Sequence, residues 1–124
     1  MDQSGRALTD RTNLGKAGER LALAYLKSKG FKILEKNLRT RFGELDIIAN
    51  DHGTLVFIEV KTRTSSVFGS PIQGVTKQKK ARLRNLALRY LADKGLSETE
   101  VRFDVLGILQ TKDQIQIEHI PNAF

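Results

Sequence analysis

The chain has 124 residues, a length that predicts one domain with its own hydrophobic core. It contains no cysteine, which excludes disulfide bonds and thiolate zinc sites, and it has no run of about 18 apolar residues that would form a membrane span. The net charge of +7 favours a polyanionic partner, most often a nucleic acid. Because the N-terminus has no apolar stretch of the signal-peptide type, we expect a cytoplasmic protein.

The first half of the chain predicts one helix and three strands. Residues 1–12 are polar and lack periodicity, so we expect a flexible N-terminal arm, followed by a single domain over residues 13–124. Apolar residues recur at helical spacing over residues 14–29. Strand-like segments follow at 31–39, 43–49 and 54–61, with a turn at 50–53.

The second half predicts one helix and two strands. Residues 62–74 form a long loop, and a loop of that length in a small domain is usually functional or mobile. A helix is expected over 75–95, capped by Thr76 and ended by Gly95, with an apolar stripe of Leu83, Leu86, Ala87, Tyr90 and Leu91. Strands are expected at 101–109 and 114–120.

The hairpin formed by the second and third strands combines apolar and charged residues. If Asn50 pairs with Leu55, Asp46 lies opposite Glu59, and Lys61 shares their face. Strict alternation then assigns to the core a second face made of Leu45, Ile47, Ala49, Val56, Ile58 and Val60.

Two adjacent carboxylates repel each other unless a cation lies between them, and Mg²⁺ prefers oxygen ligands of this kind. Asp46 and Glu59 are therefore candidate metal ligands, and Lys61 could hold a phosphate oxygen or steer an attacking water. The alternative interpretation is a solvated salt bridge between Glu59 and Lys61, with Asp46 as an uninvolved neighbour.

Basic residues cluster in the second predicted helix and beside the hairpin. Arg41 and Arg63 flank the charged end of the hairpin and could grip a phosphate backbone. From residue 77 to 94 the helix carries one acid, Asp93, against Lys77, Lys79, Lys80, Arg82, Arg84, Arg89 and Lys94. Such a series suits phosphate contacts, which give affinity without reading sequence, although a solvated basic face is the alternative.

The hairpin residues resemble a known superfamily. "GELDIIA" followed by "FIEVKT" is similar to the PD-(D/E)xK nucleases, whose pattern is an Asp on one strand and an acid-x-Lys on the next, matched here by Asp46 and by Glu59 with Lys61. A closer resemblance is to the uncharacterised bacterial YraN-like family, through "GKAGE" (15–19), "GELDII" (43–48), "FIEVKTR" (57–63), "FGSP" (68–71) and "RFDV" (102–105). The superfamily's proline before the Asp is Leu45 in this chain.

This resemblance implies an α/β, restriction-endonuclease-like fold with a central mixed five-stranded sheet flanked by helices, in the order α-β-β-β-α-β-β. It implies Mg²⁺ or Mn²⁺ bound by Asp46, Glu59, the Val60 carbonyl and Glu19, with Asp46, Glu59 and Lys61 catalytic. For Glu19 the alternative is an acid that favours the helix dipole. The expected nucleic-acid contacts are Arg41, Arg63, Lys77, Gln78, Lys79 and Lys80.

The expected activity is metal-dependent hydrolysis of phosphodiester bonds in DNA. A distant similarity to archaeal Holliday-junction resolvases implies a branched or structured substrate and a homodimer. Two alternatives stay open: a nucleic-acid-binding module of the same fold without efficient catalysis, and a protein–protein adaptor, whose binding would not depend on salt.

Overall fold

A computed structural model of the chain describes residues 3–64 and 70–124, and describes side-chain surroundings for 16–64 and 70–124. Their elements follow the predicted order of helix, three strands, helix and two strands. The elements are α1 (Gln3–Ser28), β1 (Lys32–Thr40), β2 (Gly43–Asp51), β3 (Thr54–Arg63), the 3₁₀ turn η2 (Pro71–Gly74), α2 (Lys77–Lys94), β4 (Val101–Gln110) and β5 (Ile115–Ile120).

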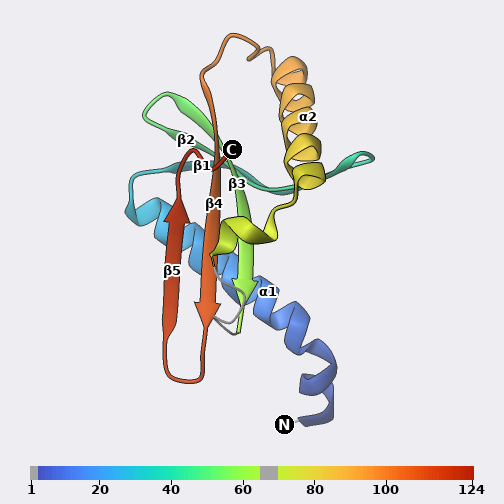
Figure 1. Cartoon of the computed structure of the whole chain (residues 1–124), viewed down its shortest axis with the longest axis vertical. Coiled ribbons are helices and arrows are strands. Elements are labelled where there is room, and N and C mark those ends of the chain that lie inside the picture. The colour runs from blue at the N-terminus through green and yellow to red at the C-terminus, as the bar shows by residue number, and fades with distance from the viewer. Residues whose placement is uncertain (1–2, 65–69) are drawn as a thin grey trace.

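The strands of the described residues form one mixed sheet in the order β1-β2-β3-β4-β5 (Figure 1). Neighbouring strands are antiparallel except β3 and β4, which are parallel because the chain crosses over through η2 and α2 between them. The predicted pairing of Asn50 with Leu55 is confirmed. The sheet, its order and its two helices confirm the expected fold class, which is consistent with a restriction-endonuclease-like architecture.

Each face of the sheet is covered by one helix. The α1 side buries Ala22, Leu26, Phe31, Ile47, Ala49, Val56, Ile58, Leu106 and Ile108. The α2 side buries Leu45, Ile48, Leu55, Phe57, Val75, Leu83, Leu86, Ala87, Tyr90, Leu91 and Val105. The predicted core face is thus correct for Ile47, Ala49, Val56 and Ile58. The prediction was wrong for Leu45, which packs on the α2 side, because alternation along β2 is not maintained around Asp46.

Helix α2 forms as the sequence predicts. The Thr76 hydroxyl accepts a hydrogen bond from the Lys79 backbone N–H at 3.1 Å, which satisfies one of the free donors of the first turn. Gly95 ends the helix with φ of 67°, a left-handed conformation that glycine adopts without strain. All five residues of the predicted apolar stripe are buried.

Helix α1 is longer than predicted, since it begins at Gln3 and includes most of the segment expected as an arm. The flexibility of that segment stays a prediction. Near its middle α1 crosses β3 at Gly18, where a Cβ atom would overlap the Thr62 hydroxyl. Glycine therefore allows the close approach that brings the next residue, Glu19, over the sheet. No helix in the described part of the chain is both long and apolar enough to cross a membrane.

The predicted loop over 62–74 is partly ordered into η2, where Pro71 packs on Gly107 of β4. A Cβ at Gly107 would come within 2.7 Å of Pro71 Cβ, so this strand position requires glycine. Residues 65–69, which include the first two residues of "FGSP", lie outside the described residues.

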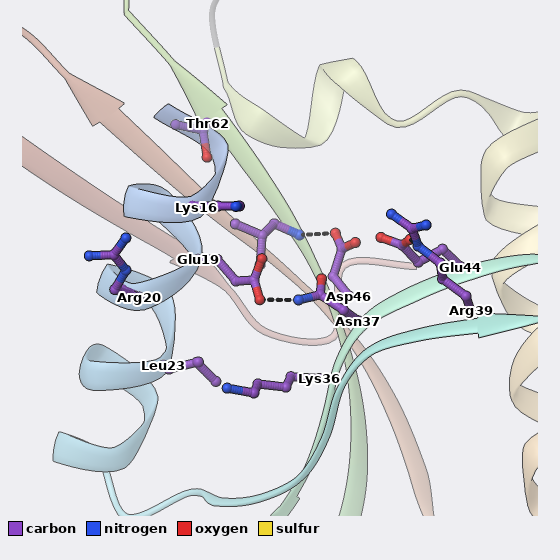
Figure 2. Close-up of a pocket in the computed structure, with 11 residues that line it drawn as sticks. Lys16, Glu19, Arg20, Leu23, Lys36, Asn37, Arg39, Glu44, Asp46 and Thr62 are labelled. Atoms are coloured by element: carbon purple, nitrogen blue, oxygen red, sulfur yellow. Dashed lines mark hydrogen bonds and ion pairs between the residues drawn. The ribbon is translucent and has the colours of Figure 1, made fainter. Parts of the chain in front are cut away.

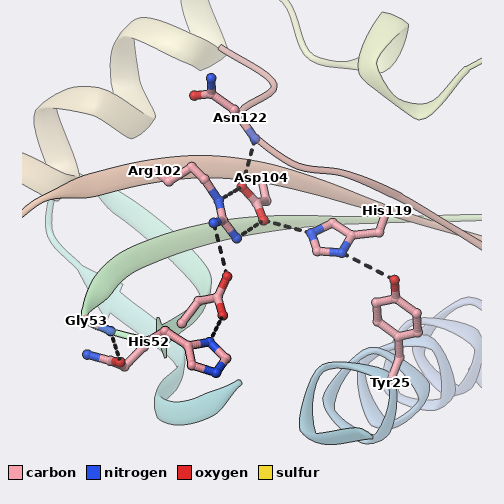
Figure 3. Close-up of polar contacts among 9 residues, drawn as sticks. Tyr25, His52, Gly53, Arg102, Asp104, His119 and Asn122 are labelled. Carbon is pink, nitrogen blue, oxygen red and sulfur yellow. Dashed lines mark hydrogen bonds and ion pairs between the residues drawn. The ribbon is translucent and has the colours of Figure 1, made fainter. Parts of the chain in front are cut away.

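A buried polar network ties β4 to β5 and α1 (Figure 3). The Asp104 carboxylate is fully buried and accepts hydrogen bonds from Arg102, His119 Nε2 at 2.7 Å and the Asn122 N–H at 3.0 Å. The Tyr25 hydroxyl meets the other ring nitrogen of His119 at 3.3 Å. Burial alone would raise the pKa of Asp104, but these hydrogen bonds outweigh it and lower the pKa.

Candidate active site

Asp46 lies where the paired part of the β2–β3 hairpin ends. The two strands pair from Asp51 with Thr54 up to Ile47 with Ile58. One residue further, the Asp46 carboxylate accepts a hydrogen bond from the Val60 backbone N–H at 3.0 Å. The Asp46 side chain thus takes the place of the next backbone partner, and its carboxylate is held against β3 near Glu59.

The environment of Asp46 opposes its negative charge. Burial, and next the nearby charge of Glu59, raise the pKa of Asp46 from 3.8 to about 7. The Val60 N–H and the charge of Lys79 act in the opposite direction but do not compensate. Glu59 and Asp46 also line the same small hollow. Two carboxyl groups are therefore held together at a position where a cation between them would relieve their repulsion.

Glu59 is buried, with only 5% of the residue exposed, on the α2 side of the sheet. Its carboxylate pairs with Lys79 of α2, Nζ to Oε2 at 3.0 Å, and lies 3.7 Å from Lys61 Nζ. The alternative interpretation, a solvated salt bridge between Glu59 and Lys61, is wrong about solvation, because the Glu59 carboxylate is buried. Lys79 contributes the closer positive charge, and Lys61 is the more distant of the two.

A cleft of about 580 Å³ opens on the α1 side of Asp46 (Figure 2). Its walls come from α1, β1, β2 and β3, and its lining contains Lys16, Glu19, Arg20, Leu23, Lys36, Asn37, Arg39, Glu44, Asp46, Val60 and Thr62. Within the cleft the Asn37 amide donates to the Glu19 carboxylate, and Arg39 pairs with Glu44 at 2.9 Å. Four basic residues against three acids give the walls a slight excess of positive charge.

The predicted metal ligands are only partly gathered. Asp46, Glu19 and Val60 line the cleft, whereas Glu59 reaches Asp46 from the α2 side, where a small hollow includes both carboxyl groups. Among residues 3–64 and 70–124, no three His, Cys, Asp or Glu side chains are arranged to hold a metal ion. In proteins Mg²⁺ is commonly held by one or two carboxylates and keeps several water ligands.

The predicted nucleic-acid contacts fall at different places. Lys77 and Gln78 are exposed at the start of α2, and Lys79 points to Glu59. Lys80 Nζ lies 5.8 Å from the Phe124 ring centroid. Arg41 is at the tip of the β1–β2 hairpin, while Arg63 lines a separate hollow beside Pro71 and Gly107. The structure therefore does not bring Arg41 and Arg63 to one surface.

Some lining residues were missed from the sequence. Lys16 and Leu23 lie three residues before and four residues after Glu19, so helical spacing from that residue could have found them. Arg20 is the next residue in the chain and lines the cleft as well. Asn37 has a positive φ of 51° in β1, an uncommon conformation that no sequence signal predicted. Its contact with Glu19 joins residues 18 positions apart, which only the folded sheet brings together.

Comparisons with known proteins give one consistent result. A sequence model of the uncharacterised protein family UPF0102 matches residues 18–108. The chain is 53% identical over 114 residues to a UPF0102 protein of Thermodesulfovibrio yellowstonii, covering 92% of this chain and 97% of the relative. It is 46% identical over 121 residues to a UPF0102 protein of Geotalea daltonii, covering 97% and 95%. The matched span includes Glu19, Asp46, Glu59 and Lys61.

Proposed function

The chain belongs to the uncharacterised protein family UPF0102, and from its site we propose that it is a Mg²⁺- or Mn²⁺-dependent endodeoxyribonuclease of the PD-(D/E)xK type. Its substrate is DNA, with branched or structured DNA favoured by the likeness to Holliday-junction resolvases. The observation that carries the proposal is the pair of carboxyl groups, Asp46 and Glu59, held together beside Lys61 with the pKa of Asp46 raised to about 7.

The energetic cost of this arrangement supports a functional role. A carboxylate that is buried loses its hydration, which costs free energy. A second carboxylate placed beside it adds electrostatic repulsion between the two charges. Strongly perturbed carboxyl groups are concentrated at functional sites for this reason. Basic residues on the walls of the adjoining cleft, Lys16, Arg20, Lys36 and Arg39, suit a polyanionic substrate.

Each residue of the site has a separate part in the proposed reaction. Asp46 and Glu59 would hold the divalent ion. Lys61, whose side chain is 31% exposed, neutralises charge on the phosphoryl oxygens as attack proceeds. When bound, the ion supplies Lewis-acid stabilisation and a water of lowered pKa. Lys79, with Nζ 3.0 Å from Glu59 Oε2, would compete with the ion for this carboxylate.

One observation favours a second function. Lys79 already supplies a positive charge at 3.0 Å from Glu59, and the described residues offer no third acidic or imidazole ligand beside the pair. A protein in which Lys79 permanently replaces the ion would bind nucleic acid without cutting it. The second candidate is therefore a nucleic-acid-binding module of the same fold.

A gel experiment separates the two functions. Wild type and Lys61→Ala are incubated with linear, flapped, single-stranded and four-way-junction DNA, in Mn²⁺ and in EDTA, and both binding and cleavage are measured. Metal-dependent cleavage by the wild type that is lost in Lys61→Ala supports the nuclease. Lys112→Ala, which removes a lysine from the exposed β4–β5 turn, is the matched control and should cut like wild type.

Glu59→Gln tests the role of the carboxylate directly. In a nuclease this variant loses cleavage and keeps or gains DNA binding, because a negative charge near phosphate is removed. DNA binding by both proteins without cleavage of any substrate in any metal contradicts the nuclease and supports the binding module. Binding that does not weaken with rising salt contradicts both, since phosphate contacts release counterions.

A further inference from the structure

The tip of the β1–β2 hairpin carries an exposed aromatic ring. Phe42 is 48% exposed although burial of a phenylalanine side chain is strongly favourable. The guanidinium carbon of Arg89 lies 3.7 Å from the ring centroid, and that of Arg41 lies 5.4 Å from it. Both are within the range of cation–π attraction, so the ring has a defined orientation while much of its surface stays in solvent.

The hairpin tip is held against α2 by close packing. Gly43, the residue after Phe42, has φ of 146°, a backbone conformation that other residues rarely adopt, and leaves little room for a side chain. A Cβ there would lie 3.1 Å from Leu86 Cδ1 and 3.4 Å from Arg82 Cδ. The teal hairpin passes beside α2 in Figure 1. Because the ring is positioned before any partner binds, little ordering is required on binding.

The charges around Phe42 are mostly positive. Arg41, Arg82 and Arg89 lie at this corner, and Arg39 at the end of β1 is almost fully exposed. The nearby acids are Glu44, which pairs with Arg39, and Glu35 and Asp93, which line the same hollow as Arg89. An aromatic ring among arginines suits a nucleotide, since the base stacks on the ring and the phosphates meet the guanidinium groups.

We infer that Phe42, held by Arg89 and flanked by Arg41, is a stacking site for one unpaired nucleobase of the DNA substrate. This inference rests on the proposed function. A base inside a continuous duplex is already stacked on its neighbours and has no free face for the ring, so the occupant is a nucleotide in a flap, gap, junction or single strand.

The position of Phe42 sets the distance between the stacked base and the cleavage site. Asp46 lies in β2, four residues after Phe42 in the turn, which gives at most roughly 13 Å at about 3.3 Å per residue. That length corresponds to about four base steps at the 3.4 Å rise of stacked DNA. Arg39 and Glu44, which line the cleft with Asp46, lie between the two points on the hairpin.

A tryptophan at position 42 reports stacking directly, because the chain contains no tryptophan. Phe42→Trp is titrated in EDTA with single-stranded DNA, continuous duplex, and an abasic single strand. If a base stacks on the ring, the tryptophan emission should be quenched by single-stranded DNA and unchanged by the continuous duplex and the abasic strand. The matched control is Ile115→Trp, at a β5 position that is 47% exposed and should stay unquenched.

Affinity is then compared between wild type and Phe42→Ala. We expect weakening of about 5- to 100-fold for single-stranded and flapped DNA, and less than about twofold for continuous duplex and for inorganic polyphosphate. The stacking site is overturned if wild type and Phe42→Ala bind single strands equally well and the emission of Phe42→Trp is not quenched. In that case, DNA binding and Mn²⁺-dependent cleavage by the wild type would still leave the proposed function in place. Failure of the wild type to bind any DNA overturns both.

Discussion

Lys79 acts as the counter-ion of Glu59 in the metal-free protein, and Lys79→Met tests this role. At the 3.0 Å separation of Nζ and Oε2, Coulomb's law with an effective dielectric constant of about 20 gives an attraction of about 5 kcal/mol. Desolvation of the lysine cancels part of this, and Lys61 remains 3.7 Å away. We therefore expect Lys79→Met to lower the free energy of unfolding by about 1–3 kcal/mol.

The assay is thermal unfolding in EDTA and in Mn²⁺. A loss of 1–3 kcal/mol corresponds to a fall of about 4–12 °C in Tm for a domain of this size. A divalent ion bound by Glu59 would compete with Lys79 in the wild type but not in the variant, so Mn²⁺ should raise the Tm of Lys79→Met by more than that of wild type. Lys77→Met removes the same charge from the same helical turn and should change neither value appreciably.

Two results would refute this reasoning. If Lys79→Met is as stable as Lys77→Met in EDTA, the ion pair contributes nothing to folding. If Mn²⁺ raises the Tm of both proteins equally, the ion does not compete with Lys79 for the Glu59 carboxylate.

Three further predictions concern the site and its support. Asp46→Asn should raise the free energy of unfolding in EDTA by about 1–2 kcal/mol at pH 8, a figure reduced for solvent screening. Because the folded pKa of Asp46, about 7, lies above the ordinary 3.8, denaturant titration should show this gain appearing between about pH 4 and 7. A gain that persists at pH 3 contradicts this cause. Gly18→Ala should lower Tm because the new methyl group overlaps the Thr62 side chain, with a loss of about 1–3 kcal/mol in the free energy of unfolding. The double variant Gly18→Ala with Thr62→Ala should largely recover this loss, and a loss that is not recovered points to another cause. Asp104→Asn should lower the free energy of unfolding by about 3 kcal/mol at pH 7, since a buried ion pair loses one partner. Because the pKa of Asp104 is lowered in the folded protein, the stability that its charge contributes is lost as pH falls below about 4. A penalty that is unchanged at pH 3 therefore argues that the charge of Asp104 is not its cause.

Local signals in the sequence predict the elements, their order and much of their packing. Helix α2 was predictable because its cap, its glycine stop and its apolar stripe are all local signals within 20 residues. The pairing of Asn50 with Leu55 was predictable because a short turn leaves a hairpin few registers. The extent of α1 was not, since its first turns carry no apolar periodicity for a pattern to detect.

The tertiary structure alone decided the surroundings of the candidate site. Sequence placed Glu59 beside Lys61, but its burial and its closer partner, Lys79 from the crossover helix, depend on how α2 packs on β3. The same holds for the raised pKa of Asp46, which comes first from burial. Spacing along a strand fixes which side chains are neighbours, whereas burial and long-range partners depend on contacts between segments far apart in the chain, and these exist only after folding.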